Sequence, residues 1–281
     1  MRKRLIVFAL LSLLFFFFTS NTLTIIHNSK KIPFTLMIKS LKDADVVFVG
    51  EQHTDPKAHF VELEVFKALY HLKKGKIILS LEMFERDVQP ILNLYLEGEI
   101  TEEEFLKSSR PWNNYKTDYR PLVEFAKEKG IRVIASNVPR RYAAMVSRKG
   151  LAILKEIPEK ERKFIAAKIY YEYPKYRELF YKTMKAMGGP MGRHGASKFK
   201  EKFYKSQCVK DSTMAESISK IIKNYPDYLI LHINGSFHSD YKLGTAAVLK
   251  TLNPKVKIIN IKVLPDNKND VENKIADYIV F

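Results

Sequence analysis

The sequence contains a single cysteine, Cys208, among 281 residues. One cysteine cannot form an internal disulfide, so outside the cytosol the folded chain must draw its stability from its core. Cys208 also lies far from the N-terminus, so no lipid-anchoring cysteine follows a leader and the chain is not an evident lipoprotein. Low-complexity segments and nucleic-acid-binding motifs are missing too, and no internal repeat occurs beyond one short doubled motif, which favours one ordinary compact domain.

Positive charge is in large excess. The chain carries 48 Lys and Arg against 31 Asp and Glu, a net charge of +17, which is still +14 without the three basic residues at positions 2–4. Such an excess attracts nucleic acid, anionic lipid or an anionic small ligand, and it indicates partners, not a fold. Because the lysines are scattered over predicted helix surfaces, we expect most of them to be solvated and expect no nucleic-acid partner.

The N-terminus has the pattern of an export signal. Arg2, Lys3 and Arg4 precede an apolar run from Leu5 to Phe18, and polar residues follow. The run is short for a membrane span, although residues 23–26 extend it, and no Ala-x-Ala cleavage site follows. We therefore predict an export signal or N-terminal anchor over residues 1–26, an exported protein that is periplasmic or membrane-anchored, and a single domain over residues 30–281.

Apolar runs alternate with amphipathic stretches along this domain. Strands are predicted at Asp45–Val49, Lys76–Leu81, Ile131–Ala135, Tyr228–Ile233 and Val256–Val263, with an edge strand at Tyr278–Phe281. Helices are predicted at Ile32–Leu41, Pro56–Leu72, Val88–Leu96, Glu102–Lys107, Pro121–Lys129 and Pro139–Lys149. The rhythm predicts an α/β fold, a mainly parallel sheet with helices on both faces. A helical insertion, broken at Met187–Gly195, is expected over about residues 151–224.

One short pattern occurs twice, as Gly50-Glu51-Gln52-His53 and Gly235-Ser236-Phe237-His238. Each copy follows directly on an apolar strand. With 11 Gly and 7 His in 281 residues, chance gives about 0.3 matches to Gly-x-x-His. Glycine at such a corner permits a sharp turn or the close approach of a ligand, and the histidine can bind a metal or titrate near neutral pH.

Four consecutive predicted strands place polar side chains just beyond their carboxyl ends. In order along the chain these are Glu51 and His53, then Glu82, then Asn137 and Arg140, then His238. Ligands bind at this edge of open parallel sheets, so the set predicts a site. Glu82 supports it, because a carboxylate within an apolar run is costly to bury without a partner.

Other candidates have two interpretations each. His232 lies inside an apolar strand and is expected to be a hydrogen-bonded core residue, whereas His59 and His71 lie on an amphipathic helix, where surface or capping roles compete with function. The insertion is rich in Tyr and Met. These side chains form either ordinary helix packing or a soft aromatic wall for a large flat ligand.

Several motifs together resemble the ChaN-type haem-binding uptake proteins. They are Val47–His53 with His59, Leu81–Arg86 with Gln89, Pro111-Trp112, Tyr119-Arg120-Pro121, Ala135–Arg140, Gln207 with Asp211, Met214 and Ala215, and Asn234–His238. The resemblance implies an exported, iron-acquisition-related haem binder whose dimers hold two haems face to face. It also implies kinship with the Tiki, TraB and erythromycin-esterase group, which uses paired Gly-x-x-His motifs in metal-dependent hydrolysis. Departures occur at Thr54-Asp55, Phe60 and Ser236-Phe237, and the lipobox cysteine is absent.

Two functions therefore compete. In the first, the chain binds haem without catalysis and serves iron uptake as a homodimer, with an outer-membrane haem receptor as its partner. In the second, it is a hydrolase dependent on divalent Zn, Mn or Co, with Glu51, His53 and His238 as metal ligands and Glu51 and Glu82 as catalytic carboxylates. The haem-binding candidates are His53, His59, Glu82, Arg86, Asn137, Arg140 and His238, with Tyr173, Tyr176, Met191 and His194 from the insertion.

Overall fold

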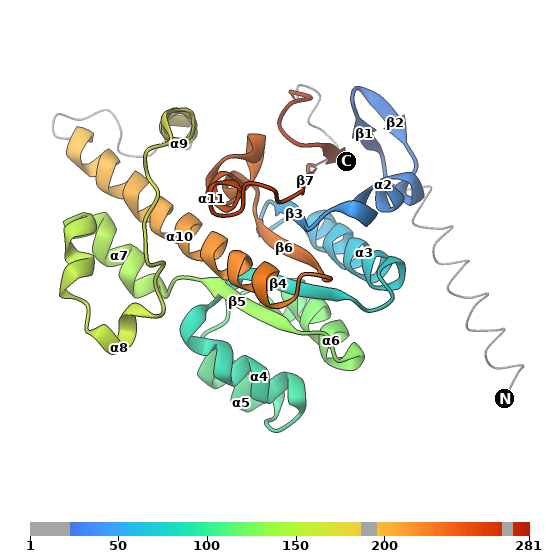
Figure 1. The fold of residues 1–281 in the computed structure, drawn as a ribbon, viewed down its shortest axis with the longest axis horizontal. Coiled ribbons are helices and arrows are strands. Elements are labelled where there is room, and N and C mark those ends of the chain that lie inside the picture. Colours follow the sequence, from blue (N-terminus) through green and yellow to red (C-terminus); the bar gives the residue numbers. More distant parts are fainter. Residues whose placement is uncertain (1–22, 187–195, 266–271) are drawn as a thin grey trace, which may run out of the picture.

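A computed structural model describes residues 23–186, 196–265 and 272–281 and contains one eight-stranded sheet in the order β2-β1-β8-β7-β3-β6-β4-β5 (Figure 1). The strands are β1 (Ile25–His27), β2 (Lys30–Ile32), β3 (Val46–Glu51), β4 (Ile77–Glu85), β5 (Val133–Asn137), β6 (Leu229–Gly235), β7 (Ile258–Val263) and β8 (Tyr278–Val280). The run from β8 to β5 is parallel throughout, whereas β1 pairs antiparallel with both β2 and β8. The α/β fold with a mainly parallel sheet is confirmed.

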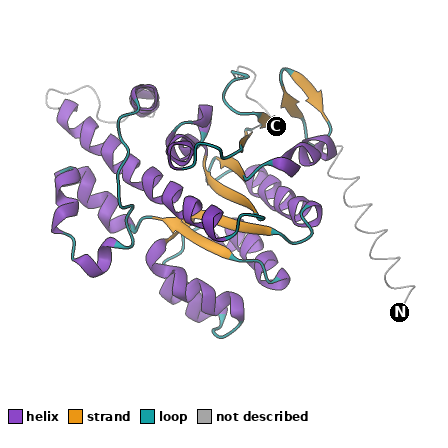
Figure 2. Cartoon of the chain, viewed as in Figure 1, coloured by secondary structure: helices purple, strands orange, loops and turns teal. Residues whose placement is uncertain are grey.

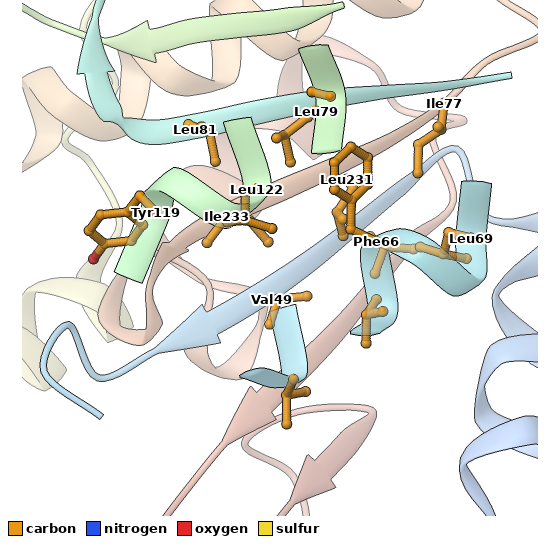
Figure 3. Packing of buried hydrophobic residues seen from close by; sticks show 14 of the residues in the cluster. Val49, Phe66, Leu69, Ile77, Leu79, Leu81, Tyr119, Leu122, Leu231 and Ile233 are labelled. Atoms are coloured by element: carbon orange, nitrogen blue, oxygen red, sulfur yellow. The ribbon is translucent and has the colours of Figure 1, made fainter. Parts of the chain in front are cut away.

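Helices cover both faces of the sheet because the side chains of each central strand alternate between two apolar clusters (Figure 2). Val47 and Val49 of β3 pack against α3 (Pro56–Leu72) and α6 (Arg120–Lys129), as Figure 3 shows for Val49, Phe66 and Leu122. Val46 and Phe48 pack on the opposite face. The helices there are α10 (Ala196–Asn224) and α11 (Gly244–Leu252).

The remaining helices surround this core. On the α3 side lie α2 (Phe34–Ser40), α4 (Gln89–Glu97) and α5 (Glu102–Ser109), and α7 (Arg140–Lys149) packs on α10. The helix α3 begins and ends where predicted. Asp55 caps it by accepting a hydrogen bond from the Lys57 backbone N–H at 3.0 Å, and Pro56 occupies the first turn, where its missing N–H costs nothing.

The region predicted as a helical insertion is only partly helical. It contains a 3-10 segment (Leu151–Glu156), α8 (Glu159–Arg162), α9 (Pro174–Ala186) and α10, whereas residues 163–173 form no helix. Side chains of α10 accept backbone hydrogen bonds there instead: Ser212 Oγ from Tyr170 at 2.9 Å and Glu216 Oε2 from Ala167 at 2.8 Å. The break predicted at Met187–Gly195 lies outside the described residues.

The two ends of the described chain meet in the sheet. The backbones of Thr24 and Phe281 exchange hydrogen bonds of 3.2 and 2.8 Å, and β8 pairs with β1 on one side and β7 on the other. β8 is therefore an interior strand, not the edge strand expected from sequence.

Ile25, within the segment expected to be export signal, is buried in β1. In the described ranges, no helix has both the length and the apolarity needed to cross a bilayer.

Candidate functional site

The two Gly-x-x-His motifs lie side by side at the carboxyl edge of the sheet. β3 and β6 are parallel neighbours, and their register places Glu51 opposite Gly235. Each glycine abuts the other motif: a Cβ on Gly50 would lie 3.0 Å from the Ser236 Cα, and a Cβ on Gly235 would lie 2.6 Å from the His53 ring. Neither glycine has a positive φ, so both are required for close approach and not for a sharp turn.

His53 is the half-exposed member of the site, with 42% of its side chain accessible. Its Nδ1 lies 2.6 Å from Glu51 Oε1, and its ring meets Trp112 edge-on at 4.7 Å between centroids. Asn114 donates to the His53 carbonyl at 2.8 Å and so fixes the backbone. Burial lowers the pKa of His53, but the hydrogen bond to Glu51 and the charge of Glu82 outweigh it and raise that pKa above its usual value.

Glu82 and His238 form a buried pair beside His53. The pairing of β4 with β5 changes register between Leu81 and Glu85, and Glu82 lies within this irregular stretch. Glu82 Oε2 accepts a hydrogen bond from the Gly235 N–H at 2.8 Å, and its Oε1 lies 3.2 Å from His238 Nε2. Burial opposes both charges, yet their mutual attraction lowers the pKa of Glu82 and, together with Asp211, raises that of His238 to about 10.

Asp211 of α10 holds the other side of His238. Its Oδ1 lies 2.7 Å from His238 Nδ1 and accepts from the Thr245 hydroxyl at 2.8 Å, and its Oδ2 accepts from the Tyr176 hydroxyl at 2.8 Å. Both ring nitrogens of His238 therefore face carboxylates. Asp211 is a member of the site that the sequence did not single out as one.

A second buried group lies behind His53, between β3 and α3. His59 Nδ1 is 3.1 Å from Glu51 Oε2 and 3.2 Å from Glu62 Oε2. Burial raises the pKa of Glu62 well above its usual value, reinforced by the charge of Glu51, whereas hydrogen bonds from the two histidines outweigh burial and lower the pKa of Glu51 to about 2. The same carboxylates raise the pKa of His59 to about 10 against its burial. Glu62 was missed in the sequence, where only its i, i+3 spacing from His59 marks it.

The metal-ligand set named from the sequence is not the one that the geometry assembles. Within the described ranges, the three side chains whose ligand atoms all lie within 4.8 Å of one another are Glu51, His59 and Glu62. Glu51 belongs to both sets, but His53 and His238 do not belong to the assembled one.

Three further predicted residues have structural partners. Arg86 is nearly buried and its guanidinium bonds to α10, at Ser217 Oγ (2.8 Å) and the Thr213 carbonyl (2.7 Å). Asn137 Oδ1 accepts from the next backbone N–H at 2.8 Å and stabilises the turn after β5. Arg140, in contrast, is 59% exposed and pairs with Glu85 at the same edge of the sheet.

The candidate haem-binding residues from the insertion lie in different places. Tyr176 is fully buried against Phe237, with ring centroids 5.1 Å apart, and so it reaches the His238 network. Tyr173 points to α11 instead, where its hydroxyl lies 2.8 Å from the Thr251 Oγ1. Met191 and His194 lie outside the described residues. His232 is the expected core histidine, 2.9 Å from the Ser80 hydroxyl.

Comparison with known proteins agrees with this architecture. Residues 37–249 match the family model described as haem-binding uptake, Tiki superfamily, ChaN. A solved structure of ChaN of Campylobacter jejuni, described as cofacial heme binding, is 19% identical, with a TM-score of 0.74 over 92% of this chain and 97% of that one. An erythromycin esterase EreC mutant is 12% identical, with a TM-score of 0.48 over 88% and 78% of the two chains.

A plant relative matches by sequence. Protein RETICULATA-RELATED 5, chloroplastic, of Arabidopsis thaliana is 21% identical over 86% of this chain, which spans only 34% of that protein's length. The family model, by contrast, covers most of this chain. The chain therefore belongs to the ChaN-type haem-binding uptake family of the Tiki superfamily.

Proposed function

We propose that this chain is an exported haem-binding protein of an iron-uptake system, which holds haem at the carboxyl edge of its sheet and pairs with a second copy of itself. Family membership supports haem as the ligand. The basic N-terminal leader pattern supports export. Cofacial haem binding, described for the Campylobacter jejuni protein, supports a paired arrangement here.

His53 carries the proposal. Its Nδ1 is anchored on Glu51, and among the described residues its Nε2 has no hydrogen-bond partner. An imidazole held by a carboxylate at one nitrogen and open at the other is the usual arrangement of a histidine that ligates a metal. Because Gly235 has no side chain, the His53 ring can lie directly against its backbone, where a Cβ would be only 2.8 Å from Nε2. When bound, the haem iron supplies a Lewis-acidic centre for this nitrogen.

The surroundings of His53 suit a flat, anionic ligand. Trp112 offers an aromatic edge beside the imidazole. Arg110 and Arg140 are 46% and 59% exposed, and Glu85 holds both of them at this edge. Their remaining N–H groups can donate charge-assisted hydrogen bonds to the two propionates. Arg86 does not share this role, because its guanidinium is bonded to α10.

Titration of the purified chain with hemin tests the proposal. We expect saturable binding, at a free energy on the order of −8 kcal/mol or better. His53→Ala should weaken it at least about tenfold, roughly 1.4 kcal/mol, and change the Soret band. His71→Ala, at an exposed position near the far end of α3, is the matched control and should bind as the parent does. Shallow, nonsaturating uptake by all three proteins would contradict the proposal.

The hydrolase alternative has less support. It requires His238 as a metal ligand, but the two ring nitrogens of His238 already face Asp211 and Glu82. A metal ion there would first have to displace one of these bonds. Hydrolysis of ester or peptide substrates by the metal-loaded chain, abolished by Glu82→Gln, would revive it.

A further inference from the structure

In the buried group formed by Glu51, His59 and Glu62, only Glu51 has a role in the haem site as proposed, because it anchors His53. Glu51 ends β3, and His59 and Glu62 occupy one face of α3, one turn apart. Their exposed fractions are 2%, 7% and 0%. One ligand atom from each lies within 4.8 Å of the others, so a single ion can reach all three.

Two buried oxygens of this group are poorly satisfied. Among the described residues, Glu62 Oε1 accepts no hydrogen bond, and Glu51 Oε2 has no partner other than His59 Nδ1 at 3.1 Å. The other oxygen of Glu51 is fully used, because Oε1 accepts from the Tyr119 hydroxyl at 2.7 Å and contacts His53 Nδ1. Two carboxylates in an apolar setting are costly to bury unless a cation compensates them. The arrangement therefore requires either a proton or a metal ion between the Glu51 and Glu62 carboxylates.

The orientation of His59 adds to this requirement. Its Nε2 lies 3.2 Å from the His53 carbonyl oxygen and 3.3 Å from Asp118 Oδ2, and neither a carbonyl nor a carboxylate can donate. Nε2 therefore carries the hydrogen and donates. Nδ1 then points at two carboxylates and needs either a proton or a metal ion in front of it. A ligating histidine whose other N–H donates to a carbonyl or carboxylate is the pattern found at protein metal sites.

We propose that Glu51, His59 and Glu62 bind one divalent first-row transition-metal ion. This site lies next to the proposed haem site, because Glu51 contacts His53 through Oε1 and faces His59 through Oε2. Two carboxylate oxygens and one imidazole nitrogen suit Mn²⁺, Fe²⁺, Co²⁺ or Zn²⁺. Mg²⁺ and Ca²⁺ favour sites built from oxygen alone. The ion replaces the proton on Nδ1 and neutralises both carboxylates.

Substitution of Glu62 by glutamine distinguishes a bound metal ion from a proton shared within the group. The amide keeps the shape of a protonated Glu62 but removes a charged ligand, so Glu62→Gln should leave the fold intact and abolish metal binding. Glu64→Gln is the matched control. Glu64 is on the same helix, similarly buried, and pairs with Lys67 at 3.0 Å away from the group.

The haem-free full chain and both variants should be dialysed against micromolar Zn²⁺, Mn²⁺ or Mg²⁺, and the bound metal measured by mass spectrometry. We expect about one Zn²⁺ or Mn²⁺ per chain for the parent and Glu64→Gln, and at least about a tenfold loss for Glu62→Gln. Mg²⁺ should not be retained. The proposal would be overturned if the parent chain retained no more Zn²⁺ or Mn²⁺ than the buffer blank, or if Glu62→Gln retained as much as the parent.

A second measurement does not depend on any variant. A strong chelator should lower the thermal unfolding midpoint of the parent chain, because an ion that binds only the folded state stabilises it. Zn²⁺ or Mn²⁺ added to the metal-free chain should restore the midpoint. Mg²⁺ added to the metal-free chain should leave it unchanged. A midpoint that is insensitive to chelation and to Zn²⁺ and Mn²⁺ would overturn the proposal even if Glu62→Gln failed to fold.

Discussion

At the scale of single residues, Gly50 and Gly235 make different contacts, so replacing each with alanine should affect different properties. A Cβ on Gly235 meets the tip of the His53 side chain, which can swing outward, whereas a Cβ on Gly50 meets the Ser236 backbone, which cannot. Gly235→Ala should therefore weaken hemin binding about tenfold while costing less than about 1 kcal/mol of stability, and Gly50→Ala should cost about 1–3 kcal/mol. Urea unfolding and hemin titration of both variants would show this, and equal losses of stability would contradict it.

The buried charge of His238 should make stability depend on pH. Its pKa rises from 6.5 to about 10 on folding, against burial and because of Glu82 and Asp211. A raised pKa means that the imidazolium stabilises the fold fully below about pH 6.5 and that this contribution is lost as pH rises towards 10. The stability gap between the parent and His238→Gln should thus narrow by at most about 1.4 kcal/mol per pH unit in this window. Unfolding curves that stay equally far apart at every pH would rule this out.

The sequence predicted part of the site and missed the rest for a physical reason. Glu51, His53, Glu82 and His238 were predictable because the strand ends of a parallel sheet gather at one edge. Asp211 was quoted among the family motifs but not assigned to the site, because it lies on a helix and its partners come from α9, α11 and the loop after β6. No pattern in the sequence indicated that α10 would bond the guanidinium of Arg86.

At the scale of elements, the hydroxyl of Tyr176 connects α9 to the Asp211–His238 pair. Tyr176 is fully buried and donates to Asp211, which in turn orients His238. Tyr176→Phe removes the hydroxyl but keeps the ring stacked on Phe237. We expect a loss of about 1–3 kcal/mol in unfolding free energy, since a buried acceptor loses a donor. Tyr173→Phe, whose hydroxyl meets Thr251 at an exposed position, is the control, and a larger loss there would contradict this assignment.

Strand and helix order followed from apolar periodicity, whereas the geometry of the region after α7 did not. The predicted helix over residues 163–173 is absent because backbone N–H groups there bond to side chains of α10, a contact across more than 40 positions. Pro174 also disfavours a helical conformation at the residue before it. The short strands β1 and β2 were not predicted because each has only three residues, too few to show a periodic pattern, and because an apolar run precedes them in the sequence.

At the scale of the whole molecule, the proposed pairing of two chains requires that His53 be reachable from solvent. His53 is 42% accessible, so a second chain can approach the same ligand. We expect hemin to convert a monomeric chain into a dimer in sedimentation velocity, with His53→Ala remaining monomeric at the same hemin concentration. A chain that stays monomeric when saturated with hemin would contradict the paired arrangement.

The position of β1 constrains where an export signal can be cut. Ile25 is buried, and β1 pairs with both β2 and β8. A chain beginning at residue 30 should lose at least about 2 kcal/mol of stability, since it gives up the burial of this isoleucine and exposes an edge of β8. A chain beginning at residue 23 should unfold as the longer one does. If the chain is exported as proposed, mass spectrometry of the mature protein should find no cleavage after Ile25.

The pairing of β1 with β8 also sets the order in which the polypeptide can fold. The N-terminal hairpin reaches the sheet only through β8, and that strand lies more than 240 positions later in the chain. While the ribosome is still synthesising the protein, the hairpin has no partner other than itself, and an isolated two-stranded hairpin is marginal in water. We therefore expect the segment that forms β1 and β2 to stay unfolded until translation is nearly finished, in the extended form that the proposed export requires.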